Sequence, residues 1–193
     1  VNLTYLNHDL FKKLKHIIDK QKLGPIIDFK INWNFISHDL NKKNKSWKTN
    51  EKLGGGIKNI FLTHVFSYCQ FFFGDLTVKD YSIKIIKFKG LNFKNKIFCN
   101  VVSQNYLNGK ILIETKKNGL QSHKIKINFK NGQVKLFTKS KDWTKDFILE
   151  VNNKNIKKSK IYKSMNKRSF NDGRSHQIHT MIKGFLKKPN YKN

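Results

Sequence analysis

Residues 27–35 have the sequence IDFKINWNF, the cleanest alternation of apolar and polar side chains in the chain. The apolar positions are Ile27, Phe29, Ile31, Trp33 and Phe35, and every residue between them is polar. Successive side chains of a β-strand point to opposite faces of its sheet. The segment is therefore predicted to be a half-buried strand.

Helical periodicity lies on both sides of this strand. Leucine, isoleucine and phenylalanine recur at helical spacing among lysines in residues 8–20, and Gly24-Pro25 follows as a stop. Residues 37–56 are polar, rich in lysine and end in three glycines, which predicts a loop or arm. A second helix is predicted over 57–73, with Gly74 as its C-terminal stop.

The chain after Asp80 has the pattern of short strands separated by turns. Strands are predicted at 81–89, 96–102, 110–115, 123–129, 133–137 and 147–151. Turns are predicted at Asn92 and at the Asn-Gly pairs 108–109, 118–119 and 131–132, because such pairs supply the positive φ of tight hairpins. Residues 152–173 are predicted to be a basic connection, followed by a last helix from about Arg174 that ends before Pro189.

These elements predict an α+β fold of two tandem small modules, each an antiparallel sheet packed on a helix. Residues 1–77 would form the N-terminal module, which is atypical because it has one clear strand. Residues 78–193 would form a C-terminal RNA-binding module with a basic tail.

The charge of the chain points to a polyanionic partner. Its 193 residues carry 40 Lys+Arg against 12 Asp+Glu, a formal net charge of +28. Nucleic acid is the commonest polyanion for so basic a protein, and a metabolic enzyme is not expected. Only Arg168 and Arg174 are arginine and alanine is absent, which indicates an AT-rich gene and favours an organellar genome. We expect a ribosome-bound protein of the mitochondrial matrix.

Several residue groups resemble chemical sites, and each has a simpler interpretation. Cys69 and Cys99 have no metal-binding spacing and are expected to be reduced core residues. His176 and His179 are three apart on a lysine-rich helix without a third ligand, so no metal site is predicted.

Two further motifs resemble a phosphate-binding loop and a catalytic carboxylate pair. Residues 54–56, three glycines before a helix, suit a hinge or an RNA phosphate contact better than a nucleotide loop. Asp142 and Asp146 lie among lysines and are expected to form solvated ion pairs. No catalytic residues, metal or cofactor are predicted.

The last 43 residues hold ten lysines and two arginines against Asp172 alone, a net charge of 12 − 1 = +11. A solvated basic face is the ordinary explanation of a lysine run, but this concentration favours contact with phosphates. Tyr162, Phe170 and Tyr191 are interleaved and could stack on bases or pack in the core.

Three stretches, in order, resemble the ribosomal protein six family of the large subunit, as a divergent organellar member. They are IKIIKFKGLNF at 83–93, SHKIKI at 122–127 and SHQIHTMIKGFLKKPNYK at 175–192. The resemblance implies two tandem α+β modules, binding to large-subunit ribosomal RNA near the factor-binding region beside neighbouring ribosomal proteins, and no enzymatic activity. It implies no small-molecule substrate, and the chain is not expected to insert into a membrane. The residues expected to contact RNA are Arg174, His176, Gln177, Lys183, Lys187, Lys188, Tyr191 and Lys192, with Lys84, Lys87 and Lys89 on the first strand of the second module.

Two alternative functions are compatible with the sequence. One is an intron-encoded endonuclease or maturase, which would need clustered acidic residues to hold divalent metal, whereas the acids here are scattered. The other is a lineage-specific basic subunit of a different organellar complex, bound to acidic protein or anionic lipid.

Overall fold

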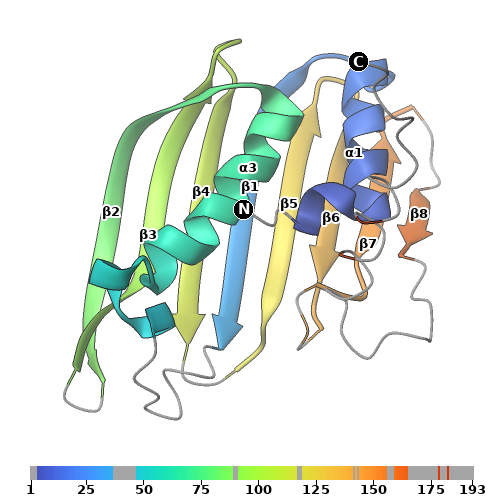
Figure 1. Cartoon of the computed structure of the whole chain (residues 1–193). Helices are drawn as coiled ribbons and strands as arrows, with labels where there is room; N and C mark the ends of the chain where they lie inside the picture. The colour runs from blue at the N-terminus through green and yellow to red at the C-terminus, as the bar shows by residue number, and fades with distance from the viewer. Residues whose placement is uncertain are drawn as a thin grey trace, which may run out of the picture.

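The computed structural model describes residues 4–36, 47–88, 91–116, 119–140, 142, 144–155, 159–164, 178 and 182. Eight strands form one sheet in the order β2-β3-β4-β1-β5-β6-β7-β8 (Figure 1). The strands are β1 (Ile26–Ile36), β2 (Leu76–Phe88), β3 (Leu91–Ser103), β4 (Asn108–Lys116), β5 (Ser122–Phe129), β6 (Gly132–Thr138), β7 (Ile148–Asn153) and β8 (Lys160–Lys163). β1 runs parallel to β4, and the other pairings are antiparallel.

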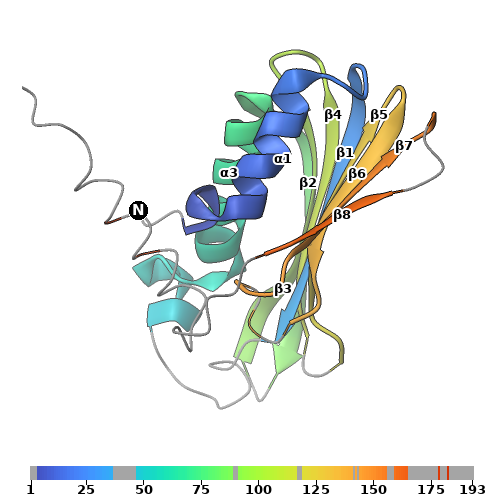
Figure 2. The same ribbon diagram turned by 90° about the vertical axis from the view of Figure 1, so that its right-hand side faces the viewer.

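The helices lie on one face of the sheet (Figures 1 and 2). They are α1 (Asp9–Lys20) and α3 (Thr63–Phe73), the latter continuing the π-helix η4 (Ile57–Leu62). Short 3-10 turns occupy η1 (Thr4–Asn7), η2 (Trp47–Thr49) and η3 (Glu51–Leu53). In the described part of the chain no helix has the length and apolar character needed to cross a membrane.

The core lies between the helices and the sheet. Phe29, Ile31 and Trp33 of β1 are fully buried, whereas Lys30 and Asn32 between them are exposed on the opposite face. Four residues of α1 complete the core on the helix side. Their spacing places them on the one side of the helix that faces the sheet: Leu10, Phe11, Leu14 and Ile18. The alternation predicted for β1 is therefore confirmed from Phe29 to Phe35. It is wrong for Ile27, which is 57% exposed where the register with β5 shifts.

Most predicted elements are present with shifted ends. The helix predicted at 8–20 is α1, and the helix predicted at 57–73 is η4 followed by α3. The six strands predicted after Asp80 correspond to β2 through β7. Cys69 and Cys99 are free and buried, as expected for reduced core residues.

The predicted architecture of two sheet-on-helix modules is wrong. β1, assigned to the first module, lies inside the common sheet between β4 and β5. Its residues pair with partners more than seventy positions later, for example Ile31 with Ile111 and with Ile125. Such pairing leaves no local pattern in the sequence. The boundary between residues 1–77 and 78–193 as separate units stays a prediction.

The turn predictions also need correction. Asn108 and Gly109 begin β4 instead of forming a turn. Packing accounts for the glycine, because a Cβ at Gly109 would meet the ring of Phe29 at 2.1 Å. The β5–β6 hairpin turns at Lys130 and Asn131, and neither Asn131 nor Gly132 has a positive φ. β8 lies in the segment predicted to be a basic connection.

The predicted last helix falls mostly outside the described residues. Ile178 and Ile182 are helical, and Ile182 is 48% exposed.

Candidate functional site

Three glycines shape the entry to η4. Gly54 and Gly56 have φ values of 84° and 87°, a left-handed conformation that other residues rarely adopt. Gly55 is buried against the chain, and a Cβ there would lie 2.1 Å from the carbonyl oxygen of Trp47. Positive φ at Gly54 and Gly56 and close backbone packing at Gly55 therefore account for the three glycines. The predicted hinge or RNA phosphate contact stays a prediction.

The π-helix follows directly and is held by side chains. Asn59 Nδ2 donates to the carbonyl oxygen of Gly55 at 3.0 Å, and Thr63 Oγ1 donates to that of Asn59 at 2.6 Å. A π-helical turn is rare and is found disproportionately at functional sites. The first turn of α3 after it carries His64, which is partly exposed.

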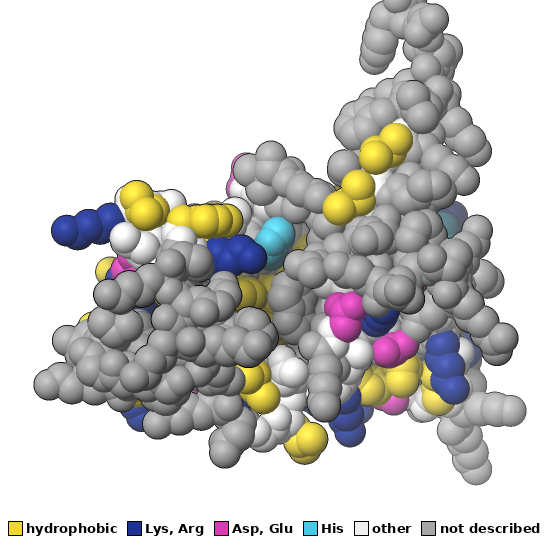
Figure 3. All heavy atoms as spheres, turned by 60° about the horizontal axis from the view of Figure 1, so that its bottom comes forward, with side chains coloured by type: hydrophobic (Ala, Val, Ile, Leu, Met, Phe, Trp, Pro, Cys, Tyr) yellow, Lys and Arg dark blue, Asp and Glu magenta, His cyan; other side chains and the backbone are white. Residues whose placement is uncertain are grey.

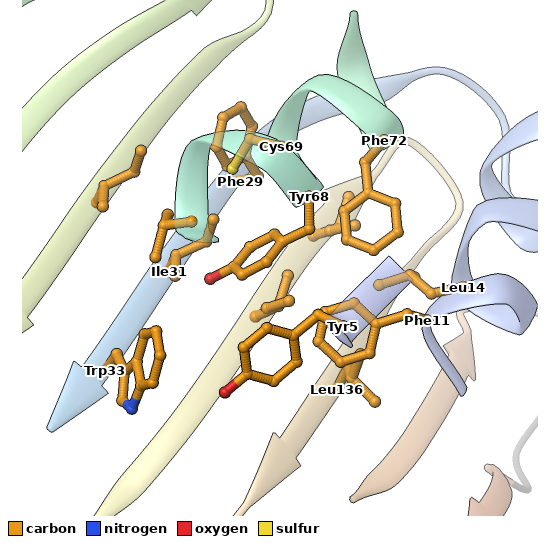
Figure 4. Close-up of a cluster of buried hydrophobic side chains, with 14 of the residues drawn as sticks. Tyr5, Phe11, Leu14, Phe29, Ile31, Trp33, Tyr68, Cys69, Phe72 and Leu136 are labelled. Atoms are coloured by element: carbon orange, nitrogen blue, oxygen red, sulfur yellow. The ribbon is translucent and has the colours of Figure 1, made fainter. Parts of the chain in front are cut away.

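A buried polar cluster lies below this turn. Tyr68 Oη and His123 Nε2 are 3.0 Å apart, and both residues are wholly buried. The His123 ring stacks on Trp33 with a centroid distance of 4.4 Å and an interplanar angle of 8°. The Tyr5 ring meets His64 and His123 edge-on, at 6.0 and 5.3 Å. In Figure 4 the hydroxyls of Tyr5 and Tyr68 point towards the side of the core where Trp33 lies.

Burial fixes the protonation states of this cluster. It lowers the pKa of His123 to about 3, with a further lowering from the nearby His64. It also lowers the pKa of His64 and raises that of Tyr68 well above its usual value. Because burial penalises charge, the two imidazoles and the phenol are neutral at pH 7.

Two ring nitrogens of the cluster are buried without a hydrogen-bond partner among the described residues. They are Nδ1 of His64 and Nδ1 of His123. Buried polar atoms are nearly always paired, so an unpaired one suggests a function or a missing partner. His64 is the one of these two residues that also reaches the surface. Figure 3, which brings the lower end of Figure 1 forward, shows hydrophobic and lysine side chains next to one another on that end of the molecule.

A separate groove lies at the C-terminal ends of the two helices. It has a volume of about 520 Å³, and its lining includes Lys15, Asp19, Phe73 and Gln104. Phe73 is nine residues beyond His64 on α3, which places the groove roughly 13 Å along the helix at about 1.5 Å per residue. The groove is therefore distinct from the histidine cluster.

The uncovered face of the sheet carries a row of lysines across four neighbouring strands. Lys30 lies opposite Lys110 on one side and Lys126 on the other, and Lys126 lies opposite Lys135. Lys135 ends the row 3.9 Å from Glu150. Like charges placed directly opposite one another destabilise a sheet, so this row is a cost to the fold.

The two other candidate sites in the sequence are the aspartate pair and the histidine pair. The aspartates lie among the described residues, and the histidines do not. Asp142 is 3.8 Å from Lys145 and accepts hydrogen bonds from Thr144, which confirms the expected solvated ion pair at that residue. Asp146 has a φ of 54°. His176 and His179 lie outside the described residues, and within them no three potential ligands cluster around a metal position.

The predicted RNA-contacting residues are not brought together in the described structure. Lys84 is exposed on β2, and of Lys87 only the backbone is described. The remaining positions lie outside the described residues: Lys89, Arg174, His176, Gln177, Lys183, Lys187, Lys188, Tyr191 and Lys192.

Comparisons with known proteins identify the fold. A model of the GFO/IDH/MocA C-terminal domain matches residues 11–87. The chain also resembles KijD10, a 3-ketoreductase from Actinomadura kijaniata solved with NADP, at 10% identity and a TM-score of 0.66, covering 96% of this chain and 51% of that one. The eight-stranded mixed sheet with its helices on one face resembles the GFO/IDH/MocA C-terminal domain.

Two other solved structures support the same fold. Levoglucosan dehydrogenase in complex with NADH and L-sorbose matches at 11% identity and a TM-score of 0.67, over 95% of this chain and 54% of that one. A super-repressor mutant of Gal80p from Saccharomyces cerevisiae matches at 13% identity and a TM-score of 0.71, over 99% and 53%. The chain spans about half the length of these structures. No curated protein sequence is detectably similar to it.

These findings overturn the functional predictions. The match to an oxidoreductase-family domain contradicts the ribosomal protein resemblance, and with it the role in a large ribosomal subunit and the expected rRNA and ribosomal-protein partners. The endonuclease or maturase and the basic subunit of another complex are equally unsupported. The expected absence of enzymatic activity and of a small-molecule substrate is contradicted, because the neighbours include a ketoreductase and a dehydrogenase.

The described residues do not fit a nicotinamide dinucleotide. Such cofactors bind where a strand runs through a glycine-rich turn into a helix within a parallel βαβ unit. Here Gly54–Gly56 follow the 3-10 turn η3 instead of a strand, and the space beside Gly55 is filled by backbone. The described part of this chain therefore provides no dinucleotide cradle.

The sequence analysis did not single out His64, Tyr68 or His123 as site residues. His64 and Tyr68 are four apart on one helix, a spacing that places them on one side. His123 comes from β5, 55 residues beyond Tyr68. The sequence signal that could have identified His123 was a histidine on an otherwise apolar face of a predicted strand.

Proposed function

We propose that this chain is the substrate-side domain of an oxidoreductase that acts at a hydroxyl or carbonyl carbon of a small sugar-like molecule. Its fold is shared with a 3-ketoreductase and with a levoglucosan dehydrogenase solved with L-sorbose. The described residues do not fit a dinucleotide. A nicotinamide cofactor would therefore be bound by residues other than those described.

One observation carries the proposal: His64 is a neutral, partly exposed imidazole at a π-helical junction. Its Nδ1 is buried, so Nε2 is the nitrogen that would meet a substrate oxygen. Oxidation of an alcohol or reduction of a carbonyl needs a group that takes or gives a proton at the substrate oxygen. A neutral imidazole can accept or donate a proton near pH 7, because the ordinary pKa of histidine lies close to that pH.

The residues beneath His64 would position it. Tyr5 meets its ring edge-on, and Tyr68 lies one helical turn later in contact with His123. Aromatic rings at these distances restrict the imidazole to one orientation and keep water from its buried nitrogen. The role given to Tyr68 and His123 is therefore positioning, without contact with substrate.

Histidine NMR tests the proposal directly. We expect L-sorbose or levoglucosan, titrated to about 100 mM, to shift the ring resonances of His64 in a saturable manner. These resonances are assigned by their loss in His64→Gln. His16→Gln, an exposed position on α1, is the matched control and should retain the response. Absence of any saturable shift at His64 with both sugars would contradict a sugar site at this residue.

The organellar location expected from the AT-rich composition stays a separate proposal. It depends on the gene and on no feature of the site. Fractionation of cells that express the tagged protein would test it.

A further inference from the structure

The sheet has two edges that differ in length and in side chains. β8 is four residues long and begins and ends with lysine, the kind of edge that resists pairing with another chain. β2 has thirteen residues, and among the described residues no strand pairs with its outer side. Three of its apolar side chains are exposed: Val78 by 41%, Tyr81 by 68% and Ile85 by 59%. A long apolar edge strand is a template for a further strand.

The pairing of β2 with β3 has two irregularities. The register with β3 shifts between Val78 and Asp80 and again between Lys84 and Ile85. From Asp80 to Lys84 the pairing is regular, and Ser82 is the middle residue of this five-residue segment. The extra residue of the first shift, Lys79, lies on β2, whereas that of the second shift, Asn95, lies on β3. β2 itself therefore offers a regular edge from Asp80 onwards.

We propose that β2 of one copy pairs antiparallel with β2 of a second copy, about a twofold axis at Ser82. In this register Asp80 of each copy lies opposite Lys84 of the other, so two ion pairs flank the axis. Tyr81 of each copy lies opposite Ile83 of the other, an aromatic and β-branched pair that stabilises antiparallel sheets. The contact is isologous and closes as a dimer.

The charges and faces of the strand specify this register. Opposed residues in an antiparallel pair point to the same face of the sheet. The twofold axis must therefore pass through a residue and cannot lie between two residues. Moving it to Tyr81 places Asp80 opposite Ser82, and moving it to Ile83 places Asp80 opposite Ile86. The carboxylate of Asp80 is already held on the uncovered face by Asn100 Nδ2, which donates to its Oδ1 at 2.8 Å.

The net charge of +28 opposes association of two copies. Charges more than a Debye length apart, about 8 Å at physiological salt, are largely screened, whereas the ion pairs and apolar pairs act at contact. The proposal therefore predicts that the dimer tightens when NaCl rises from 0.05 to 0.3 M. Sedimentation velocity on the whole chain measures this, and a monomer at 500 µM in both salts overturns the proposal.

Cysteine cross-linking tests the register. Ser82→Cys should form an intermolecular disulfide on mild oxidation, since the two cysteines face each other across the axis. Thr77→Cys is the control, because its two copies would lie about 34 Å apart at roughly 3.4 Å per residue. Cys69 and Cys99 are buried and burial raises the pKa of both, so they should not interfere. Equal cross-linking at both positions overturns the register.

Charge exchange tests the ion pairs. Asp80→Lys should weaken dimerisation at least tenfold, and the double variant Asp80→Lys/Lys84→Asp should restore it to within threefold. Lys160→Asp, combined with Asp80→Lys, lowers the net charge by the same amount but on the β8 edge, and should not restore the dimer. Failure of the exchanged pair to restore dimerisation, in a variant whose circular dichroism is unchanged, overturns the assignment.

Discussion

The two faces of the central strands are built from alternating residues of the same segments. One face is covered by helices and buried, and the other is exposed. On the helix-covered side of β1, Phe29, Ile31 and Trp33 are fully buried. On the other side, Lys30 and Asn32 are exposed among lysines of neighbouring strands. The covered face supports stability and holds the proposed site, whereas the uncovered face carries charge that the fold tolerates. The following variants test this difference.

Removal of a large side chain from the covered face should have the largest effect. Trp33→Ala deletes a fully buried ring that stacks on His123, and it should lower the free energy of unfolding by about 3–5 kcal/mol. Asn32→Ala, the next residue along β1, should change it by no more than about 0.5 kcal/mol. Urea denaturation measures both, and losses of similar size would contradict the division between the faces.

The buried hydrogen bond should show coupling between its partners. Tyr68→Phe and His123→Phe each leave one polar atom buried alone, at a cost of about 1–3 kcal/mol. The double variant removes both atoms, so its loss should be smaller than the sum of the single losses. Tyr106→Phe, on a residue 88% exposed, is the control and should be neutral. Additive losses would mean that the two groups do not interact.

The same cluster should make stability depend on acid. The pKa of His123 is about 3 in the folded protein and near 6.5 when unfolded, so between these values the unfolded chain binds a proton that the folded chain does not. Stability should therefore fall as pH falls from 6.5, with a slope approaching about 1.4 kcal/mol per pH unit from this residue.

Denaturant melts at pH 7, 5.5 and 4 measure this slope. His123→Phe should reduce it, whereas Tyr68→Phe retains the histidine and should leave most of it. Parallel pH profiles for the wild type and His123→Phe would show that His123 titrates normally.

The smallest effect is expected on the uncovered face. Lys30→Gln removes the lysine that lies opposite both Lys110 and Lys126, so it should raise the free energy of unfolding by about 0.2–0.5 kcal/mol at 20 mM NaCl. The gain should vanish in 1 M NaCl because salt screens exposed charges. Lys160→Gln changes the net charge equally but lies opposite Val151, and should give a smaller gain.

Sequence periodicity predicted the individual elements well because each follows from local spacing. The alternation around Trp33 and the stripe of α1 are examples. It failed for strand order, since the neighbours of β1 are chosen by packing between residues far apart in the chain. It also failed at Gly109, whose role depends on the ring of Phe29. The histidine cluster was missed for the same reason, because His64 and His123 meet only after the sheet has assembled.

The functional error had a different physical origin. The net charge was interpreted as evidence of a polyanionic partner, although the near absence of arginine already indicated that nucleotide bias supplied the lysines. The lysine row on the uncovered face fits that bias, since it places repelling charges together at a cost to stability. Charge composition was therefore a poor guide to function.

The central position of β1 has a consequence for synthesis of the protein. Ile26–Ile36 leaves the ribosome before its partners β4 and β5, which begin at Asn108 and Ser122. At about 5–20 residues per second, a strand with several fully buried apolar side chains waits for several seconds without its neighbours. Folding dominated by such distant contacts is slow. The nascent chain should therefore depend on chaperones that shield this strand until translation has passed residue 129.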